Sequence, residues 1–363
     1  MTRTRLFKTI FTLILFLLFS GCSRGAVHSL PSVLPVSVPV PLTEETVPLG
    51  TLSTEVSSDP ADSVAAEEIE DIPDLIPDQT ISYEIDHTES SPETVPASLD
   101  EEKESYFTIQ FLDVGQADAA LISCDNEFMM IDCGNTADSS YLYSILKEQD
   151  IPALDVLLVT HGHEDHCGGA AAVLNALPVE RILCSTNQYD SKAFFNFLKY
   201  AGKQDVTVEI PVEGDSFLLG SATVDILSCN IGSDENSNSI VTKITYGDTS
   251  FLMTGDAERD AEEHLLEAGS DLSCTVLKVG HHGSRYASIY PFLREAMPEY
   301  AVISVGNDNE YGHPTDDTLS RLRDCGAKVY RTDMQGTITM TSDGTEVTVL
   351  TERGADLETI PIK

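Results

Sequence analysis

Short apolar runs alternate with amphipathic stretches between residues 106 and 352, and this alternation predicts an α/β domain. Apolar and β-branched runs bounded by turn residues predict strands, whereas apolar positions recurring about every 3.6 residues predict helices. Because the expected helices fall between runs of strands, the pattern indicates an α/β sandwich with helices on both sides. Strands are expected at 107–112, 119–123, 128–132, a run ending at Thr160, 207–210, 223–227, 240–246, 250–253, 275–279, 301–305, 328–331, 337–341 and 346–350, and helices at 139–148, 168–175, 258–267 and from Pro314 onward.

A dense group of metal-binding side chains follows one of these apolar runs. The segment Thr160-His161-Gly162-His163-Glu164-Asp165-His166 comes directly after the run at 154–159. Imidazole and carboxylate groups are the ligands of zinc, iron and manganese sites. This spacing allows His161 and His163 to bind one ion while Asp165 and His166 reach a second, an arrangement typical of two-metal hydrolases. The alternative is a polar loop whose histidines cap the next helix.

The first 22 residues are typical of an export signal. Three basic residues precede the apolar run at 11–19, which is too short for a comfortable membrane span. The ending Leu18-Phe19-Ser20-Gly21-Cys22 resembles the lipobox of bacterial lipoproteins, although Phe19 stands where Leu is usual. That resemblance implies a lipid on Cys22 and an extracytoplasmic protein anchored to the cell membrane. An ordinary cleaved signal peptide, giving a secreted protein, is the alternative.

Residues 23–105 have the composition of a disordered tether. They carry 19 acidic residues against Arg24 and Lys103, are rich in Pro, Ser and Thr, and contain Tyr83 as their one aromatic residue. So few large apolar side chains cannot offset the entropy lost on folding. As a flexible coil the segment spans roughly 50 Å. We therefore expect a tether at 23–105, a hydrolase domain at 106–352 and a C-terminal tail at 353–363.

The charge of the chain limits its partners. With 60 acidic and 21 basic residues, the formal net charge is −39. Such a surface repels polyanions at long range, which argues against extended nucleic-acid binding and favours smaller substrates. The seven cysteines after Cys22 are scattered singly, as expected of buried free thiols, although a disulfide among them stays open.

The order of the motifs resembles the metallo-β-lactamase fold, and within it the hydrolase domain of ComEC-type DNA-uptake proteins. The resemblance covers about 106–352 and implies a four-layer αββα sandwich with a metal-dependent hydrolase site. The matching motifs are Phe111-Leu112-Asp113-Val114-Gly115-Gln116-Ala117-Asp118, Ile131-Asp132-Cys133-Gly134, the histidine cluster with Gly168-Gly169, Asn236-Ser237-Asn238-Ser239, Thr254-Gly255-Asp256-Ala257-Glu258, Val279-Gly280-His281-His282-Gly283-Ser284 and Tyr311-Gly312-His313-Pro314.

The resemblance assigns further metal ligands. It makes Asp256 the carboxylate that bridges the two metal ions, although an aspartate here can also cap the following helix. Of the adjacent pair His281 and His282, one is implied as a ligand, because neighbouring side chains on an extended backbone point to opposite faces. We expect His282 to be the ligand and His281 to contact substrate or donate a proton, the alternative being a pair of solvated turn histidines.

Other residues receive supporting roles. His313 is expected to orient the leaving group or act as general acid, with a structural role beside Pro314 as the alternative. Asp165, His281 and His313 are thus the expected catalytic residues. Asp113 and Asp132 are expected to orient metal-binding histidines, although a turn aspartate before Gly134 would give the same pattern. Residues expected to hold substrate oxygens are Asn238, Ser239 and Ser284.

One departure from the family pattern affects the metals. Many enzymes of this fold supply another histidine between the cluster and the Thr-Gly-Asp motif, but there is none between His166 and Asp256. The ion at His161 and His163 would then have a weaker set of ligands, so two divalent ions are expected to bind unequally. An oxygen-tolerant ion such as manganese becomes plausible beside zinc.

These observations lead to the hypothesis of an exported, membrane-tethered, metal-dependent hydrolase of phosphodiesters. Its substrate would be a cell-wall phosphoester, a nucleotide or DNA. Hydrolysis of a lactone, amide or thioester stays open, because the same site activates water for each reaction. A lipoprotein that uses the site only to bind a ligand is the alternative outside the enzymes.

Overall fold

The computed structural model describes residues 106–232 and 234–354. The predicted signal with Cys22, the tether and most of the C-terminal tail lie outside the described residues. Within the described part of the chain, no helix combines the length and apolar character needed to cross a membrane. Its seven cysteines are free thiols.

Two sheets form the centre of the domain. The first has eight strands in the order β15-β14-β1-β2-β3-β4-β5-β6, and the second has seven in the order β13-β12-β11-β10-β9-β8-β7. Strands β3 to β6 run parallel, as do β10 to β13, whereas the remaining neighbours are antiparallel. The strands are β1 (Phe107–Phe111), β2 (Ala119–Cys124), β3 (Glu127–Cys133), β4 (Leu154–Val159), β5 (Val179–Cys184), β6 (Val208–Glu209), β7 (Ser216–Leu219), β8 (Ala222–Ser228), β9 (Val241–Tyr246), β10 (Thr249–Met253), β11 (Val276–Lys278), β12 (Tyr300–Ile303), β13 (Lys328–Arg331), β14 (Ile338–Ser342) and β15 (Val347–Thr351).

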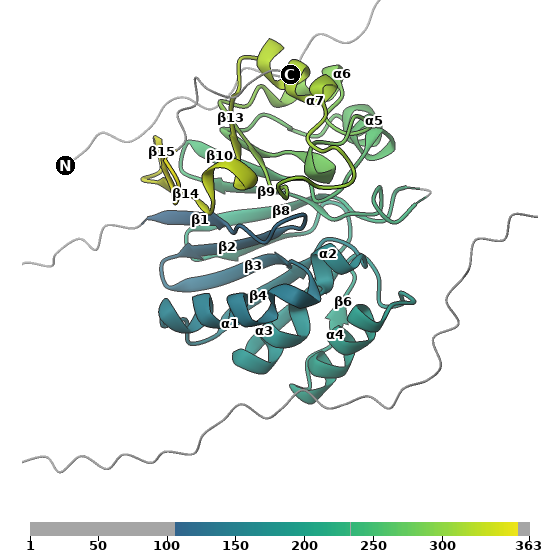
Figure 1. Ribbon diagram of the computed structural model, residues 1–363, viewed down its shortest axis with the longest axis vertical. Coiled ribbons are helices and arrows are strands. Elements are labelled where there is room, and N and C mark those ends of the chain that lie inside the picture. Colours follow the sequence, from purple (N-terminus) through teal and green to yellow (C-terminus); the bar gives the residue numbers. More distant parts are fainter. Residues whose placement is uncertain (1–105, 233, 355–363) are drawn as a thin grey trace, which may run out of the picture. The chain divides into compact units, whose positions relative to one another are not determined.

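Helices cover the outer face of each sheet, which gives four layers (Figure 1). Helices α1, α3 and α4 pack on the first sheet, and α5, α6 and α7 pack on the second. The predicted four-layer αββα sandwich is therefore confirmed. The helices are α1 (Ser139–Glu148), α2 (Glu164–Cys167), α3 (Ala170–Ala176), α4 (Lys192–Lys203), α5 (Arg259–Ala268), α6 (Tyr290–Ala296), α7 (Asp316–Asp324) and α8 (Thr332–Gln335), with the 3-10 turns η1 (Thr136–Asp138) and η2 (Gly280–Gly283).

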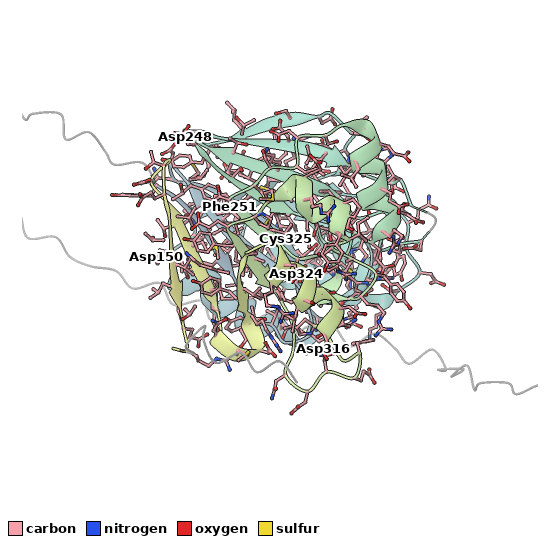
Figure 2. All side chains as sticks on the ribbon, turned by 90° about the horizontal axis from the view of Figure 1, so that it is seen from above. Asp150, Asp248, Phe251, Asp316, Asp324 and Cys325 are labelled. Atoms are coloured by element: carbon pink, nitrogen blue, oxygen red, sulfur yellow. The ribbon has the colours of Figure 1, made fainter. Side chains whose placement is uncertain are left out.

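The core between the two sheets is built from side chains that alternate along the strands. On β10, Phe251 and Met253 enter this core, while Leu252 points to the helices outside. Phe251 is fully buried and its ring centroid lies 4.6 Å from that of Phe107 on β1. Figure 2 shows Phe251 inside the molecule, whereas Asp150 and Asp248 lie at its periphery. The same alternation directs Lys278 of β11 into the space between the sheets.

Some elements escaped the prediction because their patterns are irregular. Strand β5 was not expected, since Glu180 and Arg181 interrupt its apolar run. In the structure Arg181 pairs with Glu209 of the adjacent strand β6, 2.8 Å away, so its charge lies at the sheet edge. Strand β7 and the helices α2, α4, α6 and α8 were also not predicted, and most predicted elements differ from the observed ones by one or two residues at their ends.

Candidate metal centre

The candidate site lies where the segments after β4, β10 and β11 meet. The β4 segment carries the histidine cluster, and Gly255 after β10 lies directly against it. Gly255 has φ +51°, and a Cβ there would lie 2.9 Å from the Thr160 Cβ, so only glycine brings Asp256 this close. The cavity at this junction has a volume of about 350 Å³. It is lined by Gln116, His163, Glu164, Asp165, Asn236, Asp256, His281, His282, Tyr311 and His313.

Four side chains converge beside this cavity: Asp165, His166, Asp256 and His282, whose ligand atoms all lie within 4.8 Å of one another. His166 Nε2 is 3.3 Å from Asp256 Oδ1, and His282 Nε2 is 3.2 Å from Asp165 Oδ2. His282, and not His281, therefore belongs to this group. His166 Nε2 also lies 3.7 Å from Asp165 Oδ2, and His282 Nε2 lies 3.7 Å from Asp256 Oδ1.

The four donors fit a divalent metal ion. Ligand atoms 2.0–2.1 Å from a tetrahedral metal lie about 3.3 Å from one another, close to the distances found here. Two of the donor atoms, His166 Nε2 and Asp256 Oδ1, are buried and have no hydrogen-bond partner within the described residues. Buried polar atoms are normally satisfied. A cation between these four side chains would satisfy both atoms.

The surrounding charge also favours a cation. Burial lowers the pKa of His166, but Asp256, Asp132 and Asp165 outweigh it and raise that pKa well above its ordinary value. Burial likewise opposes protonation of His282, yet Asp256 and Asp118 raise its pKa to about 10. The carboxylates therefore create a potential that draws positive charge to the imidazoles, and a metal ion satisfies the same potential.

In each of the two candidate ligand histidines, His166 and His282, the Nδ1 side of the ring lies close to a carboxylate. His166 Nδ1 donates to Asp132 Oδ2 at 2.9 Å, and Asp132 also accepts the Thr160 backbone N–H at 2.7 Å. His282 Nδ1 donates to the Ser304 carbonyl at 2.9 Å and lies 3.4 Å from Asp118 Oδ1. Partners of this kind fix the ring orientation of a metal-binding histidine.

No role was predicted for Asp118, yet it contacts a candidate ligand histidine, as Asp113 was expected to do. Asp113 forms an ion pair with Arg353 instead of contacting a metal-binding histidine. Asp118 Oδ2 lies 2.7 Å from Lys278 Nζ, and both side chains are buried between the sheets. Burial raises the pKa of Asp118, but Lys278 and His282 more than compensate and lower it, so the carboxylate stays charged.

His161 and His163 form a separate pair. His161 Nε2 lies 3.0 Å from His163 Nδ1, so both rings can face one ion. The other nitrogen of His161 contacts Thr160 Oγ1 at 3.1 Å and Ser239 Oγ at 3.3 Å. In residues 106–232 and 234–354, no group of three or more His, Cys, Asp or Glu ligand atoms converging within 4.8 Å includes either histidine.

Unusual backbone conformations accompany the site. His281 and His282 lie in the turn η2 with φ of 45° and 50°, not on an extended strand as expected. Asp132 also has a positive φ, 59°. Residues other than glycine rarely adopt this backbone region, so the surrounding structure must hold these three residues in it.

His281 faces the cavity and is oriented by an acidic partner that the sequence did not single out. Its Nδ1 lies 2.7 Å from Glu258 Oε1, and its Nε2 lies 3.7 Å from Asp256 Oδ2. Burial lowers the pKa of His281, but the bond to Glu258 and the charge of Asp256 raise it overall. His313 behaves oppositely, because burial and the neighbouring histidines lower its pKa to about 4.

The expected substrate-contacting residues occupy structural positions. Asn238 Oδ1 accepts the Gly232 N–H at 3.0 Å, and buried Ser239 accepts the Asp256 N–H at 3.1 Å. Ser284, also buried, accepts the N–H of Tyr286. None of the three is among the residues lining the described cavity. Polar groups at the cavity that sequence reasoning missed are Gln116, Asn236 and Tyr311.

A buried carboxylate anchors the loop that follows the histidine pair, and it gives a test of pH-dependent stability. Glu262 of α5 accepts the backbone N–H groups of Ser288 and Ile289, and burial raises its pKa to about 8. A folded-state pKa above the unfolded value near 4.5 means that the stabilisation is complete below that value and is lost as the pH rises through about 8. Between these two pKa values, each pH unit changes the free energy of unfolding by about 1.4 kcal/mol.

Glu262→Gln cannot ionise at this position. Its free energy of unfolding is therefore expected to fall relative to that of the wild type as the pH falls. The difference in unfolding free energy between wild type and variant should shrink by several kcal/mol on going from about pH 5 to about pH 9. Chemical denaturation over this range measures it. A difference that is independent of pH would show that Glu262 does not titrate in this way.

Comparison with known proteins gives the family of the chain. The model of the metallo-beta-lactamase superfamily matches residues 112–307. ComE operon protein 3 of Bacillus subtilis is 28% identical over 250 residues, which are 63% of this chain and 32% of that protein. Competence protein ComA of Neisseria gonorrhoeae is 32% identical over 250 residues, which are 68% of this chain and 33% of that protein. The chain thus spans about a third of the length of these relatives.

Among solved structures, the metallo-beta-lactamase fold protein YhfI from Bacillus subtilis is 13% identical, with a TM-score of 0.45; the match covers 65% of this chain and 100% of that one. The expected resemblance to ComEC-type proteins is confirmed by the curated relatives. The segment that the superfamily model matches, residues 112–307, contains the histidine cluster, Asp256 and the His281–His282 turn. The chain belongs to the metallo-beta-lactamase superfamily.

Proposed function

We propose that this protein is a metal-dependent hydrolase of phosphodiesters, exported and tethered to the membrane by a lipid on Cys22. The observation that carries the proposal is the group Asp165, His166, Asp256 and His282, which opens into a cavity lined by further histidines. When bound, zinc or manganese lowers the pKa of water and stabilises charge on phosphoryl oxygens. Asp165, His166, Asp256 and His282 would hold the first ion, and His161 with His163 would hold a second one more weakly.

The residues of the chain divide the remaining work. Asp132 keeps the ring of His166 oriented toward the metal position, and Asp118 does the same for His282. His281 presents Nε2 to the cavity, because Glu258 occupies its Nδ1. That nitrogen is suited to give a proton to the oxygen of the leaving group. His313, whose ring centroid lies 5.5 Å from that of His281, is better suited to contact substrate as a neutral imidazole.

The proposed location rests on the sequence. The basic, apolar and small-residue pattern before Cys22 favours export with lipid attachment, and the acidic segment at 23–105 favours a spacer between membrane and domain. A small cell-wall phosphoester or nucleotide suits this acidic protein better than a long polyanion, so extended nucleic-acid binding is not proposed.

A substrate panel tests the reaction class. Full-length protein loaded with zinc or manganese is expected to hydrolyse bis(p-nitrophenyl) phosphate, and this activity should disappear with a chelator and return with the metal. Cleavage of a lactone, amide or thioester with the diester untouched would replace the proposal by the other hydrolase reaction. Bound metal without hydrolysis of any member would favour a ligand-binding lipoprotein.

A further inference from the structure

The cavity beside the metal-binding group contains no lysine or arginine among the described residues that line it. Of the nearby cations, Lys278 is buried against Asp118, and Arg285 lies 3.8 Å from Asp317. Sites for polyphosphates and for dianionic phosphate groups normally supply Lys or Arg clamps. A phosphate entering this cavity therefore meets, besides bound metal and histidines, only neutral donors, which suits a phosphodiester with a single negative charge.

One neutral donor is fixed in orientation by the backbone. Gln116, in the loop between β1 and β2, accepts the N–H of Gly306 through Oε1 at 3.1 Å. The two segments are in close contact, because a Cβ on Gly306 would lie 2.7 Å from the backbone nitrogen of Gln116. A backbone N–H can only donate, so the amide must turn its oxygen toward Gly306. Within the described residues, Nε2 of Gln116 has no hydrogen-bond partner, and the side chain lines the cavity.

The second amide at the cavity is engaged elsewhere. Asn236 Nδ2 lies 3.4 Å from His281 Nδ1, and its Oδ1 is buried without a partner in the described part of the chain. A carbonyl oxygen accepts hydrogen bonds but cannot donate one to a phosphoryl oxygen. Among the two amides, Gln116 is thus the one with a free pair of N–H groups and a fixed direction.

We propose that Gln116 is a substrate-binding and specificity-determining residue, whose Nε2 donates to a non-bridging oxygen of a singly charged phosphodiester. The inference rests on the proposed function and names the substrate class of the same site. A preorganised neutral donor adds hydrogen bonding without the charge that would favour dianionic monoesters or polyphosphates.

Two substitutions separate the donor from the rest of the side chain. Gln116→Glu keeps the acceptor for the Gly306 N–H but replaces the donor by a negative charge, and Gln116→Met is neutral and similar in size. Loss of one preorganised donor costs on the order of 10²-fold in turnover. We expect kcat/KM for bis(p-nitrophenyl) phosphate to fall by that order in both variants, with the amount of bound metal unchanged. Gln116→Glu, which keeps the acceptor for the Gly306 N–H, should also keep the Tm of the wild type. Gln149→Glu, outside the cavity in a bond to Gln110, is the matched control and should behave as wild type.

Binding of unreactive diethyl phosphate to metal-loaded full-length protein, measured by calorimetry, keeps the inference independent of turnover. Wild type is expected to bind this probe about tenfold more tightly than Gln116→Met, in line with the loss of one hydrogen bond to a charged group. Wild-type turnover should favour bis(p-nitrophenyl) phosphate over p-nitrophenyl phosphate. Equal affinity of wild type and Gln116→Met would overturn the inference even if diesters are hydrolysed. Weaker binding by the variant without any turnover would support it while refuting the proposed hydrolysis.

Discussion

Replacing Asp256 by asparagine is expected to abolish tight metal binding at the four-donor group and, with it, hydrolysis. Asp256 is 2% exposed and its Oδ1 lies 3.3 Å from His166 Nε2, so the change removes a buried negative charge from the point where the ligands meet. The loss should exceed the roughly 10- to 100-fold cost of removing a partner outside the ligand set. Asparagine has nearly the same size, and the backbone N–H bond to Ser239 Oγ does not depend on the side chain.

Elemental analysis, hydrolysis of bis(p-nitrophenyl) phosphate and thermal unfolding are measured together on this variant. Asp150→Asn is the matched control, because Asp150 is exposed and has a positive φ that asparagine tolerates. The control should keep its metal and its activity. If Asp256→Asn retained one ion bound as tightly as in the wild type, the assignment of Asp256 as a ligand would be wrong.

The second large effect is expected from the buried pair of Asp118 and Lys278. Asp118→Asn removes the carboxylate beside His282. Lys278→Met removes the ammonium group that lies 2.7 Å from this carboxylate and so leaves a buried negative charge without its cation. Each variant should bind metal roughly 10- to 100-fold more weakly than wild type. Because both act through the same carboxylate, the double variant should lose less than the sum of the two single losses.

Lys243→Met provides the matched control for this pair. Lys243 is also buried in the second sheet and also forms a 2.7 Å ion pair, with Asp271, but it lies on β9 and is not among the residues that line the cavity. Lys243→Met should lower the Tm of the metal-free protein but leave the metal affinity, measured by calorimetric titration, unchanged. Metal affinity that falls equally in Lys243→Met and Lys278→Met would assign both effects to general destabilisation.

The contrast between Asp113 and Asp118 shows what the sequence could and could not predict. Both belong to one motif five residues apart, and nothing local distinguishes them. The partners that distinguish them, Arg353 for one and Lys278 with His282 for the other, come from segments more than 150 residues away. The histidine cluster, by contrast, is contiguous, so its chemistry was visible without the fold.

The same distinction holds for the fold. Helix α1 was predicted at its exact limits because its amphipathic pattern is local. His281 and His282 were expected to be extended, but their backbone is left-handed in the structure. The His281 N–H donates there to the carbonyl of Gly255, a contact with a segment far away in the sequence. Glu258 was likewise not predicted to orient His281, since their 2.7 Å contact exists only when β10 and β11 lie side by side.

The central claim is that a divalent ion at Asp165, His166, Asp256 and His282 makes this chain a phosphodiester hydrolase. It is tested most directly by titrating metal-stripped full-length protein with zinc or manganese while bound metal and hydrolysis of bis(p-nitrophenyl) phosphate are followed in the same samples. We predict that activity appears as the tightest site fills and that His166→Ala shows neither this binding phase nor activity. Filling of the tightest site without any diester hydrolysis, or an unchanged binding phase in His166→Ala, would contradict the claim.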